Sequence, residues 1–177
     1  MTPALTLVLG GASSGKSAWA EQLVRSFGLP CLYLATARPH DAEMAAKIAE
    51  HRARRGEGWQ TVEAPDGLAE ALRAAPPDHA ILLDCLTIWL SNRLLADADL
   101  AAETADLLDA MTGRAAPLVA VSNEVGQGIV PDNALARRFR TLQGRLNCEI
   151  AARSGLVVAV MAGLPLALRG NLPAGAP

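Results

Sequence analysis

Gly10-Gly11-Ala12-Ser13-Ser14-Gly15-Lys16-Ser17 decides the fold, because it matches the phosphate-loop pattern G-x-x-x-x-G-K-[S/T] at every fixed position. It directly follows an apolar run, residues 5–9, and opens a helical stretch over residues 16–27. Glycines permit a tight turn whose N–H groups point at phosphate oxygens, and the helix N-terminus adds positive potential. The sequence therefore predicts a nucleoside-triphosphate site, with Lys16 reaching the β- and γ-phosphates and Ser17 ligating Mg²⁺.

A glycine-rich turn with a chance Gly-Lys-Ser is the alternative interpretation of this stretch. The basic residues argue against it, because 14 of the 16 are Arg and only Lys16 and Lys47 are Lys. A chain that uses Arg almost everywhere has Lys at the one position where the motif needs it. The following residues also favour the motif, since they continue as an amphipathic helix.

Further short apolar runs alternate with longer amphipathic stretches along the rest of the chain. Strands are expected at residues 31–35, 60–63, 80–83, 118–121 and 156–161. Helices are expected at residues 41–55, 66–74, 86–95, 100–111 and 133–153. Continuous apolar strands between helices favour one α/β domain over residues 1–177, with a mostly parallel sheet covered by helices on both faces. Residues 163–177 are expected to form a loosely ordered tail.

Two helix details add to this interpretation. Asp41 is a candidate N-cap for the helix 41–55. In the long stretch 133–153, apolar residues recur at spacings of three and four and predict one buried face. Those residues are Leu135, Phe139, Leu142, Leu146 and Ile150.

Composition narrows the function classes. The net charge of −2 and an aromatic content of 3% argue against a nucleic-acid-binding surface. The three cysteines have neither disulfide-framework nor zinc-site spacing, and Cys31 and Cys85 are expected to be buried free thiols. The N-terminus does not read as a signal peptide, and no apolar run reaches the roughly 18 residues of a membrane span. We therefore expect a cytoplasmic protein.

Polar residues close two of the expected strands. Asp84 ends the run 80–83 and is the best candidate for a second Mg²⁺-side group, although it could instead cap the following helix. Asn123 and Glu124 close the run 118–121 in the same way. Open α/β sheets bind ligands at the carboxyl ends of their strands, so we expect these residues near the substrate.

His51 is the third candidate, late in the helix 41–55 and followed by Arg52, Arg54 and Arg55. A lone histidine on a polar helix is most often a solvated surface residue, and so is an arginine cluster. Together, however, a neutral imidazole and several guanidinium groups suit nucleophilic attack on a nucleotide phosphate. His40 and His79 lie beside turn residues and are expected at the surface.

Seven segments of the chain are similar to the successive motifs of one enzyme. They are Gly10 to Ser17, Tyr33-Leu34-Ala35-Thr36-Ala37, Asp41-Ala42-Glu43-Met44, Ile48-Ala49-Glu50-His51-Arg52, Trp59-Gln60-Thr61-Val62-Glu63, Ile81-Leu82-Leu83-Asp84-Cys85-Leu86-Thr87 and Ser122-Asn123-Glu124-Val125-Gly126-Gln127-Gly128-Ile129-Val130-Pro131. The chain thereby resembles the bifunctional adenosylcobinamide kinase/adenosylcobinamide-phosphate guanylyltransferase family of cobalamin biosynthesis. The resemblance runs from residue 7 to about residue 163.

The resemblance implies two reactions: phosphorylation of adenosylcobinamide by ATP or GTP, then transfer of GMP from GTP through a guanylyl-histidine. By motif position His51 carries the nucleotide and Lys16 acts at the phosphates. It implies nucleotide contacts at Gly10 to Ser17, Ala35, Thr36, Ala37, Arg52, Ala53, Arg54, Arg55, Glu63 and Asp84, with Mg²⁺ on Ser17 and Asp84. It also implies a RecA-like P-loop fold and a homo-oligomer, expected to be a trimer.

Two other functions remain open from the sequence. One is a P-loop kinase of another small metabolite, in which His51 is a surface residue. The other is a RecA-like nucleotide-gated module acting on DNA or a protein partner, for which the chain lacks a basic stripe. Because His51 and the phosphate loop lie on separate helices, either the helix 41–55 moves toward the loop when GTP binds or the two reactions use different nucleotide poses. We expect this helix to be mobile without ligand.

Overall fold

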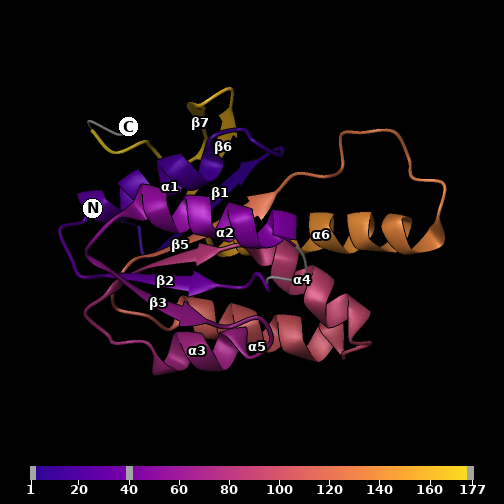
Figure 1. Cartoon of the computed structure of the whole chain (residues 1–177), viewed down its shortest axis with the longest axis horizontal. Coiled ribbons are helices and arrows are strands. Elements are labelled where there is room, and N and C mark those ends of the chain that lie inside the picture. The colour runs from indigo at the N-terminus through magenta and orange to yellow at the C-terminus, as the bar shows by residue number, and fades with distance from the viewer. Residues whose placement is uncertain (1–2, 39–41, 175–177) are drawn as a thin grey trace.

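The phosphate-loop strand lies inside a seven-stranded sheet in a computed structural model that describes residues 3–38 and 42–174 (Figure 1). The strand order is β3-β2-β4-β5-β1-β6-β7. The strands are β1 (Leu5–Gly10), β2 (Cys31–Ala35), β3 (Trp59–Glu63), β4 (Ala80–Asp84), β5 (Leu118–Asn123), β6 (Leu156–Met161) and β7 (Leu164–Arg169). All neighbouring pairs are parallel except β6 and β7. The predicted mostly parallel sheet is therefore confirmed.

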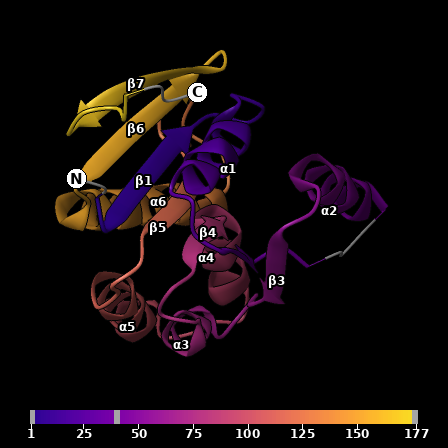
Figure 2. The same cartoon turned by 90° about the vertical axis from the view of Figure 1, so that its left-hand side faces the viewer.

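Helices cover both faces of this sheet. They are α1 (Lys16–Ser26), α2 (Ala42–Arg55), α3 (Leu68–Ala74), α4 (Leu86–Leu95), α5 (Leu100–Thr112) and α6 (Ala134–Arg153). Helix α1 packs Trp19, Leu23 and Val24 on one face, whereas α3, α4, α5 and α6 build a larger core on the other. Helix α2 lies outside α1 (Figure 2). In the described part of the chain, no helix is long and apolar enough to cross a membrane.

The central strands are buried runs, as their sequences predict. Both faces of β1 and β5 are covered, so Leu7, Val8, Ala120 and Val121 are all fully buried. Strand β5 separates the phosphate-loop strand β1 from β4, the strand that ends in Asp84. The carboxyl ends of β1, β4 and β5 nevertheless meet at one edge of the sheet, which positions the candidate site.

The prediction of a loosely ordered tail is wrong for residues 164–169, which form strand β7. Strand β7 pairs antiparallel with β6 through a tight turn in which Ala162 and Gly163 both have positive φ, 52° and 79°. Proline and glycine made this stretch look irregular, but Pro165 is tolerated because β7 is an edge strand. Leu164, Leu166 and Leu168 alternate with more covered residues and remain exposed.

The long helix α6 is only partly as expected. Leu146 and Ile150 are buried, and Phe139 and Leu142 pack against the same core. Leu135 is 50% exposed, because the N-terminal part of α6 extends beyond the sheet (Figure 1).

Asp41, expected to cap α2, and His40 lie outside the described residues. His79 is more covered than expected, with a side chain 12% exposed and paired with Asp78.

Candidate active site

The phosphate loop connects β1 to α1 in the conformation that the motif requires. Gly15 caps α1 with φ 93°, a left-handed conformation that glycine adopts without strain. A Cβ on Gly10 would lie 2.7 Å from the Val160 carbonyl oxygen. The Lys16 ammonium donates to the Gly11 carbonyl at 3.0 Å, so it already folds back over the loop. These contacts leave the loop backbone shaped to cradle phosphate oxygens.

The turn between β6 and β7 supports this loop from outside. The Gly163 N–H donates to the Ser14 carbonyl at 2.9 Å. A Cβ on Gly15 would lie 3.0 Å from the Gly163 Cα, so the two backbones are in close contact. Residue 163 gave no motif signal, and this support could not be foreseen from the sequence.

Asp84 lies at the carboxyl end of β4 with its side chain only 9% exposed. Burial raises the pKa of its carboxyl group, while interactions with His51, the Ser17 hydroxyl and Lys16 lower it. Its Oδ2 atom is buried without a hydrogen-bond partner. An orphaned carboxylate oxygen beside the Ser17 hydroxyl fits a magnesium ion, which usually takes few protein ligands and completes its shell with phosphates and waters. The described residues contain no cluster of three or more His, Cys, Asp or Glu for a metal held by the protein alone.

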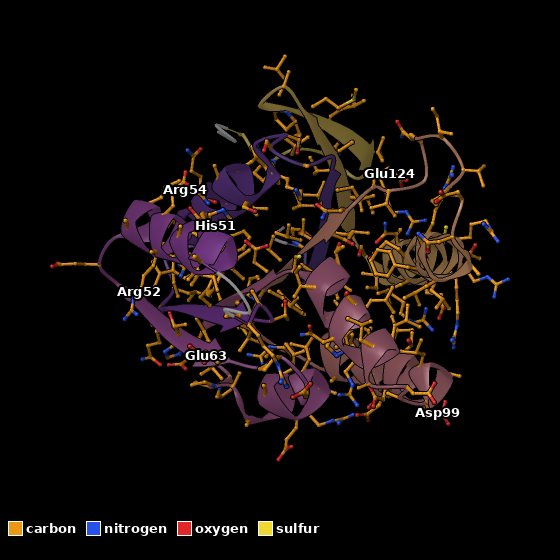
Figure 3. The ribbon with its side chains drawn as sticks, turned by 45° about the vertical axis from the view of Figure 1, so that its right-hand side comes forward. His51, Arg52, Arg54, Glu63, Asp99 and Glu124 are labelled. Carbon is orange, nitrogen blue, oxygen red and sulfur yellow. The ribbon has the colours of Figure 1, made fainter. Side chains whose placement is uncertain are left out.

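His51 reaches this carboxylate from α2. Its Nδ1 atom lies 3.9 Å from Asp84 Oδ2, and its side chain is 26% exposed. Burial lowers the pKa of the imidazole, an effect that the negative charge of Asp84 opposes. Figure 3 shows His51 on α2, with Glu63 on the neighbouring β3 and Glu124 on the other side of the sheet edge. The structure thus brings His51, Asp84 and the start of α1 together, although they are far apart in sequence.

The arginines that follow His51 have different surroundings. Arg54 makes two hydrogen bonds to the buried carboxylate of Glu21, at 3.0 and 2.8 Å. Arg55 is buried, with its guanidinium carbon 3.4 Å from the centre of the Tyr33 ring. Arg52 and Ala53 are exposed. The sequence did not reveal that Arg54 and Arg55 have partners within the protein, because Glu21 and Tyr33 belong to other elements.

The expected contacts after β2 and β3 lie at the same end of the sheet. Ala35 pairs in register with Asp84 on one side and with Glu63 on the other. Thr36 is fully buried, and its hydroxyl donates to the Cys85 carbonyl at 2.8 Å and accepts from the Cys85 N–H at 2.9 Å. Its side chain therefore holds the turn after Asp84. Glu63 is exposed and Ala37 half-buried, so both are nearer the rim.

Asn123 and Glu124 lie beside the phosphate loop. Asn123 pairs with Gly10 in the sheet register, and the Glu124 N–H donates to the Gly10 carbonyl at 3.1 Å. The Asn123 Oδ1 atom is buried without a hydrogen-bond partner. This orphaned oxygen at the sheet edge is consistent with the expected position near a substrate.

A buried polar network supports these two residues from α6. The Ser122 hydroxyl donates to Asn147 Oδ1 at 2.6 Å, and Gln143 donates to both at 2.9 and 3.0 Å. Asn147 in turn donates to the Asn123 carbonyl at 3.1 Å. Buried polar groups of this kind fix backbone position because each needs its partners. In the sequence Ser122 is only one member of a motif, and nothing there predicts its partners on α6.

The chain matches one family of known proteins over most of its length. Residues 6–168 match the CobU family, described as cobinamide kinase / cobinamide phosphate guanyltransferase. The chain is 46% identical over 168 residues to the bifunctional adenosylcobalamin biosynthesis protein CobP of Pseudomonas aeruginosa, covering 93% of this chain and 97% of that protein. It is 39% identical over 181 residues to CobU of Escherichia coli, covering 93% and 99% of the two chains.

Solved structures resemble the chain in fold alone. The RadB recombinase superposes with a TM-score of 0.52 at 16% identity, covering 89% of this chain and 74% of that one. A Pyrococcus horikoshii protein, PH0250, gives a TM-score of 0.54 at 10% identity, covering 98% and 90%. Together with the strand order, these likenesses confirm the expected RecA-like P-loop fold.

Proposed function

The chain belongs to the cobinamide kinase / cobinamide phosphate guanyltransferase family and is a bifunctional enzyme of adenosylcobalamin biosynthesis, and we propose that the phosphate loop and Asp84 serve both reactions and that His51 joins them for guanylyl transfer. The observation that carries the proposal is the approach of His51 Nδ1 to within 3.9 Å of Asp84 Oδ2. A histidine without a role in catalysis is most often found at the solvated surface of a polar helix, not beside a buried carboxylate.

In the kinase reaction, the phosphate loop holds ATP or GTP with its γ-phosphate near Lys16 and Ser17. The hydroxyl oxygen of adenosylcobinamide attacks the γ-phosphorus, the bond to the β–γ bridging oxygen breaks, and the hydroxyl proton passes to solvent. Lys16 stabilises the charge that develops on the phosphoryl oxygens. His51 has no part in this step.

In the guanylyltransferase reaction, a neutral imidazole attacks the α-phosphorus of GTP. Because Nδ1 faces Asp84, we assign the attack to Nε2, whose lone pair forms the P–N bond while pyrophosphate leaves. An oxygen of adenosylcobinamide phosphate then attacks the same phosphorus. The P–N bond breaks, and adenosylcobinamide-GDP and free His51 result.

Mg²⁺ would be held by Ser17 and Asp84, and it would supply charge neutralisation at the phosphate oxygens. In the guanylyltransferase reaction, the residues Ala35, Thr36 and Ala37 would contact GTP, together with Glu63 and the exposed Arg52. Ala53, Arg54 and Arg55 belong to the same α2 segment. Because Arg54 and Arg55 already have Glu21 and Tyr33 as partners, we propose that they act on the guanylyltransferase site indirectly, by holding α2.

The remaining proposals concern partners and place. We propose a homo-oligomer, a trimer by family resemblance, and no nucleic-acid partner, for which the net charge of −2 is the support. Since both reactions consume nucleoside triphosphates, we place the enzyme in the cytoplasm.

Labelled GTP tests the proposal. Incubation of the wild-type protein with [α-³²P]GTP and Mg²⁺ should leave acid-labile label on the protein, and His51→Asn should abolish it. The same variant should still phosphorylate adenosylcobinamide with ATP. If GTP binds but the wild-type protein takes up no label, the guanylyl-histidine mechanism is wrong and the kinase alternative gains support.

A further inference from the structure

Helix α2, which carries His51, packs on the rest of the protein without contributing a described side chain to an apolar core. Figure 2 shows it outside the layers formed by the sheet and the other helices. Among its residues whose side chains are described, none belongs to either apolar core. Most helices are held by burial of an apolar face, so the position of α2 depends on other contacts.

Three polar and aromatic contacts fasten the end of α2. Arg54 makes a bidentate pair with Glu21 of α1, whose side chain is only 6% exposed. Arg55 stacks on Tyr33 of β2, and the Arg55 carbonyl accepts a hydrogen bond from Arg25 of α1. Glu21 and Arg25 lie on α1, the helix that begins at the phosphate loop, and Tyr33 lies on β2.

The spacing of these residues links the contacts to the nucleophile. Arg54 and Arg55 follow His51 by three and four residues, so all three lie on neighbouring positions of one helix face. Whatever fixes the two guanidinium groups therefore also fixes the turn of α2 that presents the imidazole to Asp84.

We infer that the Glu21–Arg54 pair and the Tyr33–Arg55 stack form a latch that positions His51 for guanylyl transfer. This inference rests on the proposed role of His51 as the nucleotide carrier. Glu21, Tyr33, Arg54 and Arg55 are positioning residues, since they act through α2. The kinase reaction uses the phosphate loop and Asp84 without α2, so the latch separates the two activities.

An electrostatic role for the same residues makes a different prediction. Arg54 lowers the pKa of His51 and Glu21 raises it. Removing the charge of Arg54 should therefore raise this pKa, whereas removing the charge of Glu21 should lower it. A latch loses its function in both cases, because a bidentate pair needs both partners. Glu21→Gln and Arg54→Gln therefore distinguish positioning from charge.

The experiment compares these two variants with Tyr33→Leu, which leaves the ion pair intact, and with the control Asp106→Asn. Asp106 pairs with Arg73 between α3 and α5, far along the fold from α2. Single-turnover labelling with [α-³²P]GTP should slow on the order of tenfold to a hundredfold in all three latch variants, because small misplacements of a reacting group cost this much. ATP-dependent phosphorylation of cobinamide should stay within about twofold of the wild type, as should both activities of the control.

Hydrogen–deuterium exchange of the nucleotide-free proteins supplies a readout that needs no activity. Amides of α2 should exchange faster in Glu21→Gln and Arg54→Gln than in the wild type, while α5 and α6 should not change. Unchanged exchange of α2, or equal loss of both activities, would overturn the latch. Slow labelling in only one of Glu21→Gln and Arg54→Gln would also overturn the latch, and it would favour the electrostatic role. Absence of label in the wild type would overturn the proposed function instead, and the exchange result would still stand.

Discussion

His51 Nδ1 lies 3.9 Å from Asp84 Oδ2, although the two residues come from a helix outside the sheet and from a central strand. The separation is too long for a hydrogen bond but short enough for each group to affect the other's ionisation. Burial disfavours charge on both, lowering the pKa of His51 and raising that of Asp84. Neutral imidazole is the form that a phosphoryl nucleophile needs.

The pH dependence of guanylylation follows from this pair. Because the pKa of His51 is lowered from its ordinary value of about 6.5, the imidazole is neutral at pH 7 and gains a proton only in more acidic solution. The initial rate of protein labelling by [α-³²P]GTP should therefore be constant between about pH 7 and 8 and fall with a midpoint below about 6.5. A midpoint above neutrality would contradict a buried, neutral His51.

Asp84→Asn should stabilise the nucleotide-free protein while impairing both reactions. Burial in the folded protein raises the pKa of the Asp84 carboxyl group, so ionising this group costs stability. The wild type therefore loses stability as the pH rises through the folded-state pKa. Thermal melts without Mg²⁺ should show a gain of about 1 kcal/mol at pH 7 that shrinks toward pH 4. Loss of stability at pH 7 would show that the carboxylate is better solvated than its burial indicates.

Gly15→Ala should destabilise the phosphate loop. At φ 93° an L-residue is strained, and the added Cβ would lie 3.0 Å from the Gly163 Cα. Urea unfolding should show a loss of about 1–3 kcal/mol, together with weaker binding of a fluorescent GTP analogue. Gly11→Ala is the matched comparison for stability, because a Cβ there meets no atom within 4 Å, and its unfolding midpoint should match the wild type.

Asn147→Ala should weaken the support of β5 from α6. The change removes the acceptor of the Ser122 hydroxyl and the donor to the Asn123 carbonyl, and leaves buried polar groups unpaired. Unfolding in urea should show a loss of about 2–3 kcal/mol. Cys148→Ala, at the exposed neighbouring position, should change stability by less than about 0.5 kcal/mol. Similar losses in the two variants would mean that the network contributes nothing specific.

Thiol alkylation should separate the three cysteines by environment. Cys148 is exposed, whereas Cys31 is buried and burial raises the pKa of the Cys85 thiol to about 11. Iodoacetamide at pH 8 should modify one thiol rapidly and the other two only on unfolding, because the thiolate is the reactive form. Mass spectrometry of Cys148→Ser should show no rapid modification.

Much of the architecture follows from the sequence because its strands are short, continuous apolar runs and its phosphate loop is a specific motif. The runs at 31–35 and 156–161 coincide with β2 and β6. Cys31 is a buried free thiol, as expected, whereas Cys85 is a free thiol but only partly buried. The edge strand β7 was missed because its alternating pattern is short and contains Pro165. Edge strands bury little, and their sequences carry a weak signal.

The site was predictable in its parts but not in its connections. His51 and Asp84 each stand out by residue type and position, yet only the tertiary structure brings them to one place. The guanidinium groups of Arg54 and Arg55 illustrate the limit, because their partners Glu21 and Tyr33 are about 20 to 35 residues away in the chain. The structure also leaves α2 docked beside α1, so the expected mobility of this helix stays a prediction.

The position of β1 in the sheet has a consequence for synthesis on the ribosome. Within the part of the chain that the structure describes, the neighbours of β1 in the sheet are β5 and β6, and of the other strands only β7 is translated later than these two. A nascent chain therefore carries its phosphate loop without a neighbouring strand until residues 118–123 have emerged, and without the Gly163 contact until later still. Nucleotide binding to the loop can therefore assist folding only late in synthesis, and the apolar strand β1 stays unpaired until then.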